Sequence, residues 1–172
     1  LLENQRPQEI FEALDKLFLD MMVDKKILKI CNELIGRWFR FENDIVFQCD
    51  PSSPVRYSAE NLHGGQFVMQ GSFWYKFYNG RPRSGPLVFG IVCKDVKEGD
   101  GGFVAVPGSH NSNFNISGHD LTKKILKGGW KNWEFLRNPA LREGDLLIFT
   151  EALIHGSMFW KPKDRMRRIL YY

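Results

Sequence analysis

The residues with the clearest chemical potential in this sequence are its histidines. There are four of them: His63, His110, His119 and His155. The first lies in the run ENLHGGQF and the last in the run TEALIHGS, so both are followed by small residues. Because small residues leave room beside an imidazole ring, we expect these two histidines to stand at strand ends in a pocket.

Other catalytic patterns have little support. The three cysteines, Cys31, Cys49 and Cys93, are odd in number and form no CxxC pair, so neither a disulfide framework nor a structural zinc site is expected. A reducing, intracellular location is the default for such a chain. The sequence also lacks GxSxG, GxGxxG and the phosphate-loop pattern, which removes the usual signals of hydrolases and nucleotide-binding folds.

Three runs carry a family likeness in a fixed order: GGFVAVPGSHNSNF (101–114), GDLLIFTEALIHGS (144–157) and RRILYY (167–172). Together with the upstream LHGG and LIGRWFRFEND, this pattern resembles the phytanoyl-CoA dioxygenase family of Fe(II)/2-oxoglutarate-dependent oxygenases. The likeness covers most of the chain beyond about residue 25. Each run is weak alone, but the ordered combination is specific. It implies a double-stranded β-helix of the jelly-roll or cupin type.

The resemblance also implies a metal site. In such oxygenases two histidines and one carboxylate occupy one face of an octahedral iron and leave three positions open. His63 and His155, 92 residues apart, match the two histidine positions. The family carboxylate stands two residues after the first histidine, on the same strand face. That position is Gly65 in this chain, so the sequence departs from the family at a metal ligand.

No acid in the sequence clearly replaces the missing one. Glu151 precedes His155 by four residues, which on a regular strand separates them by about 13 Å. Glu60 has the wrong parity relative to His63 to share its strand face. Asn61 has the right parity, and we expect it to offer a neutral oxygen or to contact a ligand of the metal.

Gly65 leaves three functions open. We favour an oxygenase that hydroxylates a small organic molecule, with water, substrate or another residue beside the iron. The second is a halogenase, similar to iron/2-oxoglutarate halogenases in which a small residue replaces the carboxylate and chloride binds the iron. The third is a non-catalytic family member that acts as a binding or structural protein.

The cosubstrate 2-oxoglutarate needs a cation for its distal carboxylate, and the planar guanidinium of arginine suits this role. The resemblance assigns it to Arg167, twelve residues after His155, and gives Ser157 a hydrogen bond to the same carboxylate. Arg168 has the opposite strand parity, so only one of the two arginines should enter the pocket. The competing interpretation is that these arginines, with Arg165, protect a solvent-exposed edge strand by their charge.

The remaining histidines and the aromatic residues have secondary roles. His110, in VPGSHNSN, is expected to stabilise a turn outside the metal set, and His119 receives no site role. Aromatic residues of segment 66–78, together with Phe159 and Trp160, should divide between the core and an apolar or aromatic substrate pocket.

Two stretches near the N-terminus have the three-to-four spacing of amphipathic helices. They predict helices over about 8–22 and 25–35. Asp24 suits the N-cap of the second helix, and Gly36 suits its C-terminal end. We expect these helices to pack on one sheet of the domain.

After Trp38 the pattern changes to short β-rich runs separated by turn residues, which indicates a mainly β sandwich, barrel or jelly roll. The expected strands are 38–41, 44–49, 66–78, 86–95, 102–106, 145–149, 153–155 and 166–172. The least regular stretch, about 111–143, is interpreted as a long functional loop or insertion with a short helix near 119–127.

Length and composition fit one globular domain. The chain has 172 residues, 43% hydrophobic residues and a net charge of +4, which is too mild to indicate nucleic acid. No long apolar run predicts a membrane span or a signal peptide. We expect a single domain with a helical part, 1–37, and a β core, 38–172, and truncation at both ends.

Overall fold

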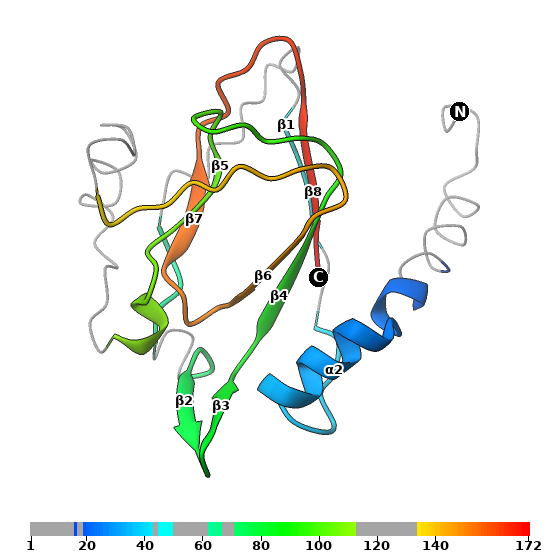
Figure 1. Cartoon of the computed structure of the whole chain (residues 1–172), viewed down its shortest axis with the longest axis vertical. Coiled ribbons are helices and arrows are strands. Elements are labelled where there is room, and N and C mark those ends of the chain that lie inside the picture. The colour runs from blue at the N-terminus through cyan, green and yellow to red at the C-terminus, as the bar shows by residue number, and fades with distance from the viewer. Residues whose placement is uncertain (1–15, 17–18, 43–44, 50–61, 67–70, 113–133) are drawn as a thin grey trace. The chain divides into compact units, whose positions relative to one another are not determined.

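The computed structural model describes residues 16, 19–42, 45–49, 62–66, 71–112 and 134–172 (Figure 1). The chain divides into two compact units, residues 1–39 and 40–172. The first unit contains the described helix, and the second contains all the described strands.

The helix α2 spans Lys25–Leu34 and confirms the second predicted helix, over about 25–35. The Asp24 carboxylate accepts hydrogen bonds from the backbone nitrogens of Lys26 and Ile27, which satisfies two donors that the first turn leaves unpaired. Gly36 follows the helix at φ +107°, a conformation that favours glycine. Residues 19–22 are also helical, while the start of the predicted first helix lies outside the described residues. None of the described helical segments is long and apolar enough to cross a bilayer.

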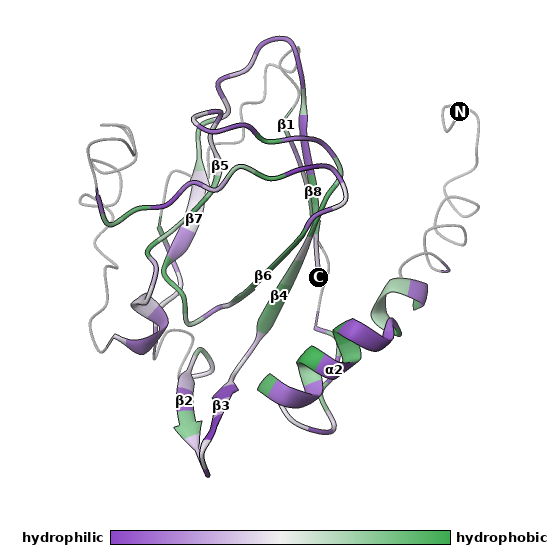
Figure 2. Cartoon of the chain, viewed as in Figure 1, coloured by the Kyte–Doolittle hydropathy of each residue, from purple (hydrophilic) through white to green (hydrophobic). Residues whose placement is uncertain are grey.

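The larger sheet has four antiparallel strands in the order β1-β8-β4-β6. These strands span Ile45–Cys49 (β1), Arg167–Tyr171 (β8), Leu87–Val92 (β4) and Leu146–Thr150 (β6). They are rich in β-branched, aromatic and leucine residues, which suit a pleated, half-buried surface. Figure 2 shows the apolar character of β4 and β6.

The smaller sheet pairs β5 (Gly102–Ala105) with β7 (His155–Met158). Single bridges add a residue on each side, since Arg137 pairs with Ala105 and His63 pairs with His155. A separate hairpin joins β2 (Tyr75–Tyr78) to β3 (Arg81–Ser84), and a short 3-10 helix, η1, spans Ser109–Asn111.

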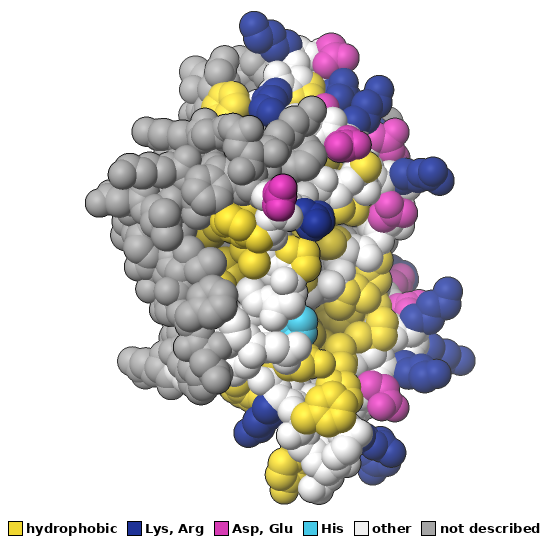
Figure 3. All heavy atoms as spheres, turned by 60° about the vertical axis from the view of Figure 1, so that its left-hand side comes forward, with side chains coloured by type: hydrophobic (Ala, Val, Ile, Leu, Met, Phe, Trp, Pro, Cys, Tyr) yellow, Lys and Arg dark blue, Asp and Glu magenta, His cyan; other side chains and the backbone are white. Residues whose placement is uncertain are grey.

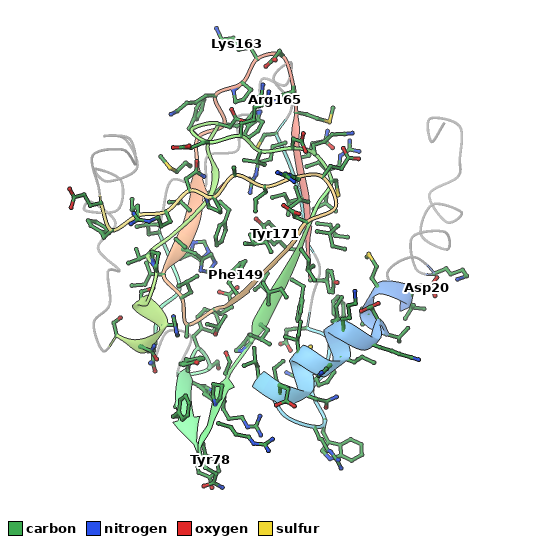
Figure 4. The ribbon with its side chains drawn as sticks, viewed as in Figure 1. Asp20, Tyr78, Phe149, Lys163, Arg165 and Tyr171 are labelled. Carbon is green, nitrogen blue, oxygen red and sulfur yellow. The ribbon has the colours of Figure 1, made fainter. Side chains whose placement is uncertain are left out.

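The two sheets face one another, and side chains from both fill the space between them, here called the interior. The rings of Phe103 on β5 and Phe149 on β6 lie 4.9 Å apart across it. Phe149 also meets Tyr171 of β8 edge to face, at 6.3 Å. Figure 4 shows Phe149 and Tyr171 pointing into this interior.

Strand alternation gives the smaller sheet two different faces. One face contributes to a buried hydrophobic cluster made of Leu62, Val104, Val106, Leu136, Ile154 and Met158. Because successive side chains of a strand point to opposite faces, the odd-numbered residues of β7, His155 and Ser157, point to the interior instead. The sheet therefore separates an apolar core on one side from polar groups on the other.

The predicted mainly β class is confirmed, but several predicted strands were wrong in extent. Residues 38–41 form no strand, and of the predicted run 66–78 only β2 is a strand among the described residues. The strand predicted at 153–155 instead begins at His155. A strand of low β propensity, β3, was missed, because its hairpin depends on the turn between the strands: Asn79 and Gly80 have φ values of +51° and +73°, as a tight hairpin requires.

The predicted insertion, about 111–143, is described only in part. Its residues 113–133 lie outside the described residues. From Glu134 onward the chain is tied to the β unit, since Arg137 pairs with Ala105 and Leu141 pairs with Val96.

We expect Leu136→Ala to lower the free energy of unfolding by about 2–4 kcal/mol, because this cluster side chain is 1% exposed and its loss leaves a cavity. The matched change Leu146→Ala, at a side chain 40% exposed, should cost less than about 1 kcal/mol. Urea unfolding of both variants measures the difference. Equal losses would show that the cluster does not stabilise the fold.

Candidate metal centre and cosubstrate site

His63 and His155 lie side by side although 92 residues separate them in the chain. Their backbones exchange two hydrogen bonds, from His63 N to His155 O at 2.7 Å and from His155 N to His63 O at 2.9 Å. The two imidazole ring centres are 4.3 Å apart, with the rings inclined by 61°. The His155 ring is buried, whereas His63 is exposed.

The two glycines after His63 allow this contact. A Cβ on Gly64 would run into the carbonyl oxygen of Leu153 and lie 2.8 Å from that of Glu151. Gly65 donates its backbone N–H to the Glu151 carbonyl at 3.2 Å. Both glycines have positive φ, +82° and +100°, which side-chain-bearing residues rarely adopt. Gly64 therefore permits the close approach of the two backbones, and Gly65 contributes its N–H and its positive φ.

The segment that His63 approaches is the turn 151–154, which links β6 to β7. Leu153 N closes the turn on Thr150 O at 2.8 Å. The Ser109 hydroxyl of η1 accepts a hydrogen bond from Ile154 N at 2.8 Å. These bonds fix the backbone immediately before His155.

A hydrogen bond determines which nitrogen of His155 is available. Its Nδ1 lies 2.7 Å from the carbonyl oxygen of Leu153, so Nδ1 carries the proton and Nε2 carries the lone pair. Burial, with a smaller contribution from His63, lowers the pKa of His155 from 6.5 to about 4, against the opposing effect of the Leu153 bond. The ring is thus neutral near pH 7, as a metal ligand must be.

The expected separation of Glu151 from the histidines was wrong. A continuous strand would separate the two residues by about 13 Å along the backbone. Instead, Glu151 Oε2 lies 3.9 Å from His155 Nε2. The reason is that β6 ends at Thr150 and the chain turns back before His155. Burial raises the pKa of the Glu151 carboxyl, and the nearby His63 opposes this rise.

Across the described residues, no three histidine, cysteine, aspartate or glutamate side chains already converge as a metal cage. A histidine pair in which Nε2 of His155 keeps its lone pair nevertheless fits a divalent metal. The pair is backed by the rings of Phe149 and Phe103, whose centres lie 4.6 Å and 6.0 Å from that of His155.

Arg167 lies in the same interior and is only 2% exposed. Its Nη1 donates to Ser157 Oγ at 3.0 Å and its Nη2 to Tyr171 Oη at 3.2 Å. Its Nε is buried and has no hydrogen-bond partner. Gly102 makes room for the guanidinium, since a Cβ there would lie 2.8 Å from Nε. No ion pair to Arg167 occurs within the described residues, so a buried cation is left without a matching anion.

The neighbouring arginines have different surroundings. Arg168 is exposed and donates to Gln48 Oε1, while Arg165 pairs with both oxygens of Asp100 at 2.7 Å. The interpretation of this segment as a charged edge strand was wrong, because β8 lies between β1 and β4.

The structure places none of the other described candidate residues in contact with the ring of His155. A Cβ on Gly65 would meet Ile154 Cγ1 at 3.4 Å, on the side of the hydrophobic cluster. His110 follows the Pro107–Gly108 turn and packs edge to face on Tyr75, at 4.6 Å. Asn61 and His119 lie outside the described residues.

The chain is similar to known proteins over much of its length. The family model of phytanoyl-CoA dioxygenase (PhyH) matches residues 71–166, more than half of the chain. This match includes His155 but begins after His63 and ends before Arg167. A search of curated proteins found no match.

Solved structures share the fold. HygX from Streptomyces hygroscopicus, crystallised with nickel and 2-oxoglutarate, is 22% identical with a TM-score of 0.70, over 90% of this chain and 62% of that one. EctD from S. alaskensis, with 2-oxoglutarate and 5-hydroxyectoine, is 14% identical with a TM-score of 0.58, over 94% and 52%. The jelly-roll expectation is thereby confirmed. The chain spans less than two thirds of the length of these proteins.

The metal-free protein should lose stability through His155 as the pH falls from about 6.5 to about 4. In this window His155 is protonated in the unfolded chain but not in the folded protein. The free energy of unfolding therefore falls by roughly 3 kcal/mol. His155→Asn keeps a donor for Leu153 O but does not titrate, so its stability should fall less. Urea unfolding at pH 7 and pH 4.5 compares the two proteins, and equal losses would mean that His155 titrates normally.

Gly64→Ala should destabilise the protein more than Gly99→Ala. Both glycines have similar positive φ values, +82° and +85°, so both substitutions carry about 1–2 kcal/mol of backbone strain. Only Gly64 faces the 151–154 turn, whereas a Cβ on Gly99 has nothing within 4 Å. Thermal unfolding of the two variants separates steric conflict from strain, and indistinguishable midpoints would contradict the close approach.

Proposed function

Because the chain belongs to the phytanoyl-CoA dioxygenase (PhyH) family, we propose that the whole protein is an Fe(II)/2-oxoglutarate-dependent oxygenase that hydroxylates a small organic molecule. The single observation that carries this proposal is that His155, paired with His63, and the buried Arg167, which has no ion-pair partner among the described residues, come together at β7. Such an arrangement suits a metal and an anionic cosubstrate bound next to each other.

His63 and His155 would hold the iron, with Nε2 of His155 as one donor atom. Iron and 2-oxoglutarate, when bound, supply the oxidising chemistry, in which O₂ converts 2-oxoglutarate to succinate and CO₂ and the substrate is oxidised. The bond from His155 Nδ1 to Leu153 holds the ring in position. Phe103 and Phe149 restrict water around the buried ring.

Arg167 would bind the distal carboxylate of 2-oxoglutarate, with Ser157 as a second donor. The guanidinium already donates to Ser157 Oγ at 3.0 Å, which orients its fork. Ser157 stands two residues beyond His155 on the same face of β7, and two such residues are about 6–7 Å apart. A five-carbon dicarboxylate can span that separation. The bound carboxylate would also supply an anion for the buried Arg167, which forms no ion pair with any described residue.

Hydroxylation is favoured over halogenation by the direction of Gly65. A side chain at this position would start toward Ile154 and the hydrophobic cluster, at φ +100°. The absence of a side chain there does not open space beside His155. A chloride site created by Gly65 therefore has no support from the local geometry.

A small-molecule substrate is consistent with the structural neighbours. A second HygX structure contains hygromycin B, and the EctD structure contains 5-hydroxyectoine. Aromatic rings stand beside His155 in the interior, which suits an apolar portion of a substrate. Among the described residues on the face shown in Figure 3, positive and negative side chains are interspersed, whereas nucleic-acid binding favours a patch of positive charge.

We expect Arg167→Lys to weaken 2-oxoglutarate binding by about tenfold or more, because lysine keeps the charge but loses the two-pronged geometry. The control Arg168→Lys changes an exposed arginine that pairs with Gln48 and should leave the affinity unchanged. An anaerobic titration with Fe(II), followed by the visible charge-transfer absorption, measures both. An unchanged affinity in Arg167→Lys would remove this residue from the cosubstrate site.

The same titration of the unaltered protein tests the function itself. A charge-transfer band that needs both Fe(II) and 2-oxoglutarate is the expected result, followed in air by succinate formation. If folded protein gives no band at saturating concentrations, the oxygenase proposal is wrong and the non-catalytic alternative takes its place.

A further inference from the structure

We propose that Glu151 is the carboxylate ligand of the metal site and replaces the acid that the family places at the position of Gly65. This inference rests on the proposed function, because it assumes that His63 and His155 bind the metal. The carboxylate would then come from the turn before the second histidine, in the pattern Glu-x-x-x-His, and no longer from the strand of the first.

Distance supports this assignment. Bonds of about 2.1 Å to nitrogen and oxygen place two donors of one metal roughly 3–4 Å apart. Glu151 Oε2 and His155 Nε2 are separated by 3.9 Å. Moreover, the bond to Leu153 leaves the lone pair on Nε2. The carboxylate therefore approaches the nitrogen that can bind a metal, and not the protonated Nδ1.

The surroundings of the carboxylate also favour a cation. The Glu151 side chain is only 21% exposed. Within the described part of the chain it accepts no hydrogen bond, although a largely buried carboxylate normally has donors or a positive partner. The atom that it faces, His155 Nε2 at 3.9 Å, carries a lone pair and no proton, because the ring proton lies on Nδ1, so the two side chains cannot hydrogen-bond to one another. A divalent metal between the two side chains would satisfy both.

The backbone of Glu151 is held by hydrogen bonds on both sides. Glu151 N donates to Pro86 O at 3.1 Å, and its carbonyl accepts from Gly65 at 3.2 Å. These two bonds anchor the main chain, while the side chain retains its rotatable bonds. The proposal therefore assigns the final approach of the carboxylate to rotation of the Glu151 side chain.

Gly65 cannot be the origin of the carboxylate, even if it were replaced by aspartate. An L-residue there would be strained at φ +100° and its Cβ would stand 3.4 Å from Ile154 Cγ1. With Glu151 as the third protein ligand, the metal keeps an anionic donor. The departure at Gly65 then marks a relocated ligand and gives no reason to expect a halide.

The test is Mn(II) binding, measured by the loss of the free-ion electron paramagnetic resonance signal without 2-oxoglutarate. Glu151→Gln keeps the size of the side chain and should weaken binding by at least about tenfold. Glu151→Asp retains a carboxylate and should bind more tightly than the glutamine variant. Glu143→Gln is the matched control, because Glu143 pairs with Lys94 at an exposed site, and its affinity should equal that of the unaltered protein.

Chemical rescue distinguishes a ligand from a structural residue. Glu151→Ala should bind Mn(II) weakly, and added formate should restore binding by supplying the missing carboxylate. Glu143→Ala should show no dependence on formate. Circular dichroism in the absence of metal verifies that each variant is folded.

The outcomes separate the two proposals. If Glu151→Gln and the unaltered protein bind Mn(II) equally well, or if formate has no effect on Glu151→Ala, the role of Glu151 is wrong while the oxygenase function stands. If the folded, unaltered protein binds no Mn(II) and gives no Fe(II)/2-oxoglutarate band, the proposed function itself fails. Recovery of tight binding in the double variant Gly65→Asp, Glu151→Gln would return the ligand position to residue 65 and overturn the inference.

Discussion

The site depends on one backbone contact, the reciprocal pair of hydrogen bonds between His63 and His155. Two strands can exchange such bonds only at close range, and the range here is set by Gly64, which leaves no atom to collide with the 151–154 turn. Once this contact forms, the imidazole rings and the Glu151 carboxylate are near one another. The residues Leu153 and Ser109 then hold the turn in place.

The second constraint is the strand alternation of β7. Ile154 and Met158 belong to the hydrophobic cluster, so His155 and Ser157 must point between the sheets. The stabilising and the functional demands on this strand are thus met by opposite faces. Burial in the interior keeps the ring of His155 neutral by lowering its pKa. It also leaves Arg167 without a charged partner among the described residues.

Local signals in the sequence worked where the structure is local. The Asp24 cap and Gly36 mark the ends of α2 correctly, and alternation gives Arg167 and Arg168 opposite environments. The local signals failed where strand pairing or a turn determines the structure. The hairpin at Asn79–Gly80 creates β3 from residues of low strand propensity, and the turn after Thr150 moves Glu151 from an expected 13 Å to 3.9 Å from His155.

The sequence alone determined the family, the mainly β class and the pairing of His63 with His155 as a hypothesis, because ordered motifs and periodicity are properties of residue order. Only the tertiary structure decided which carboxylate meets the histidines and which face Gly65 presents. These depend on where a strand stops and how closely two backbones approach. A sequence pattern interpreted as a regular strand gives neither quantity, because the turn after Thr150 ends β6 and changes the distance between Glu151 and His155.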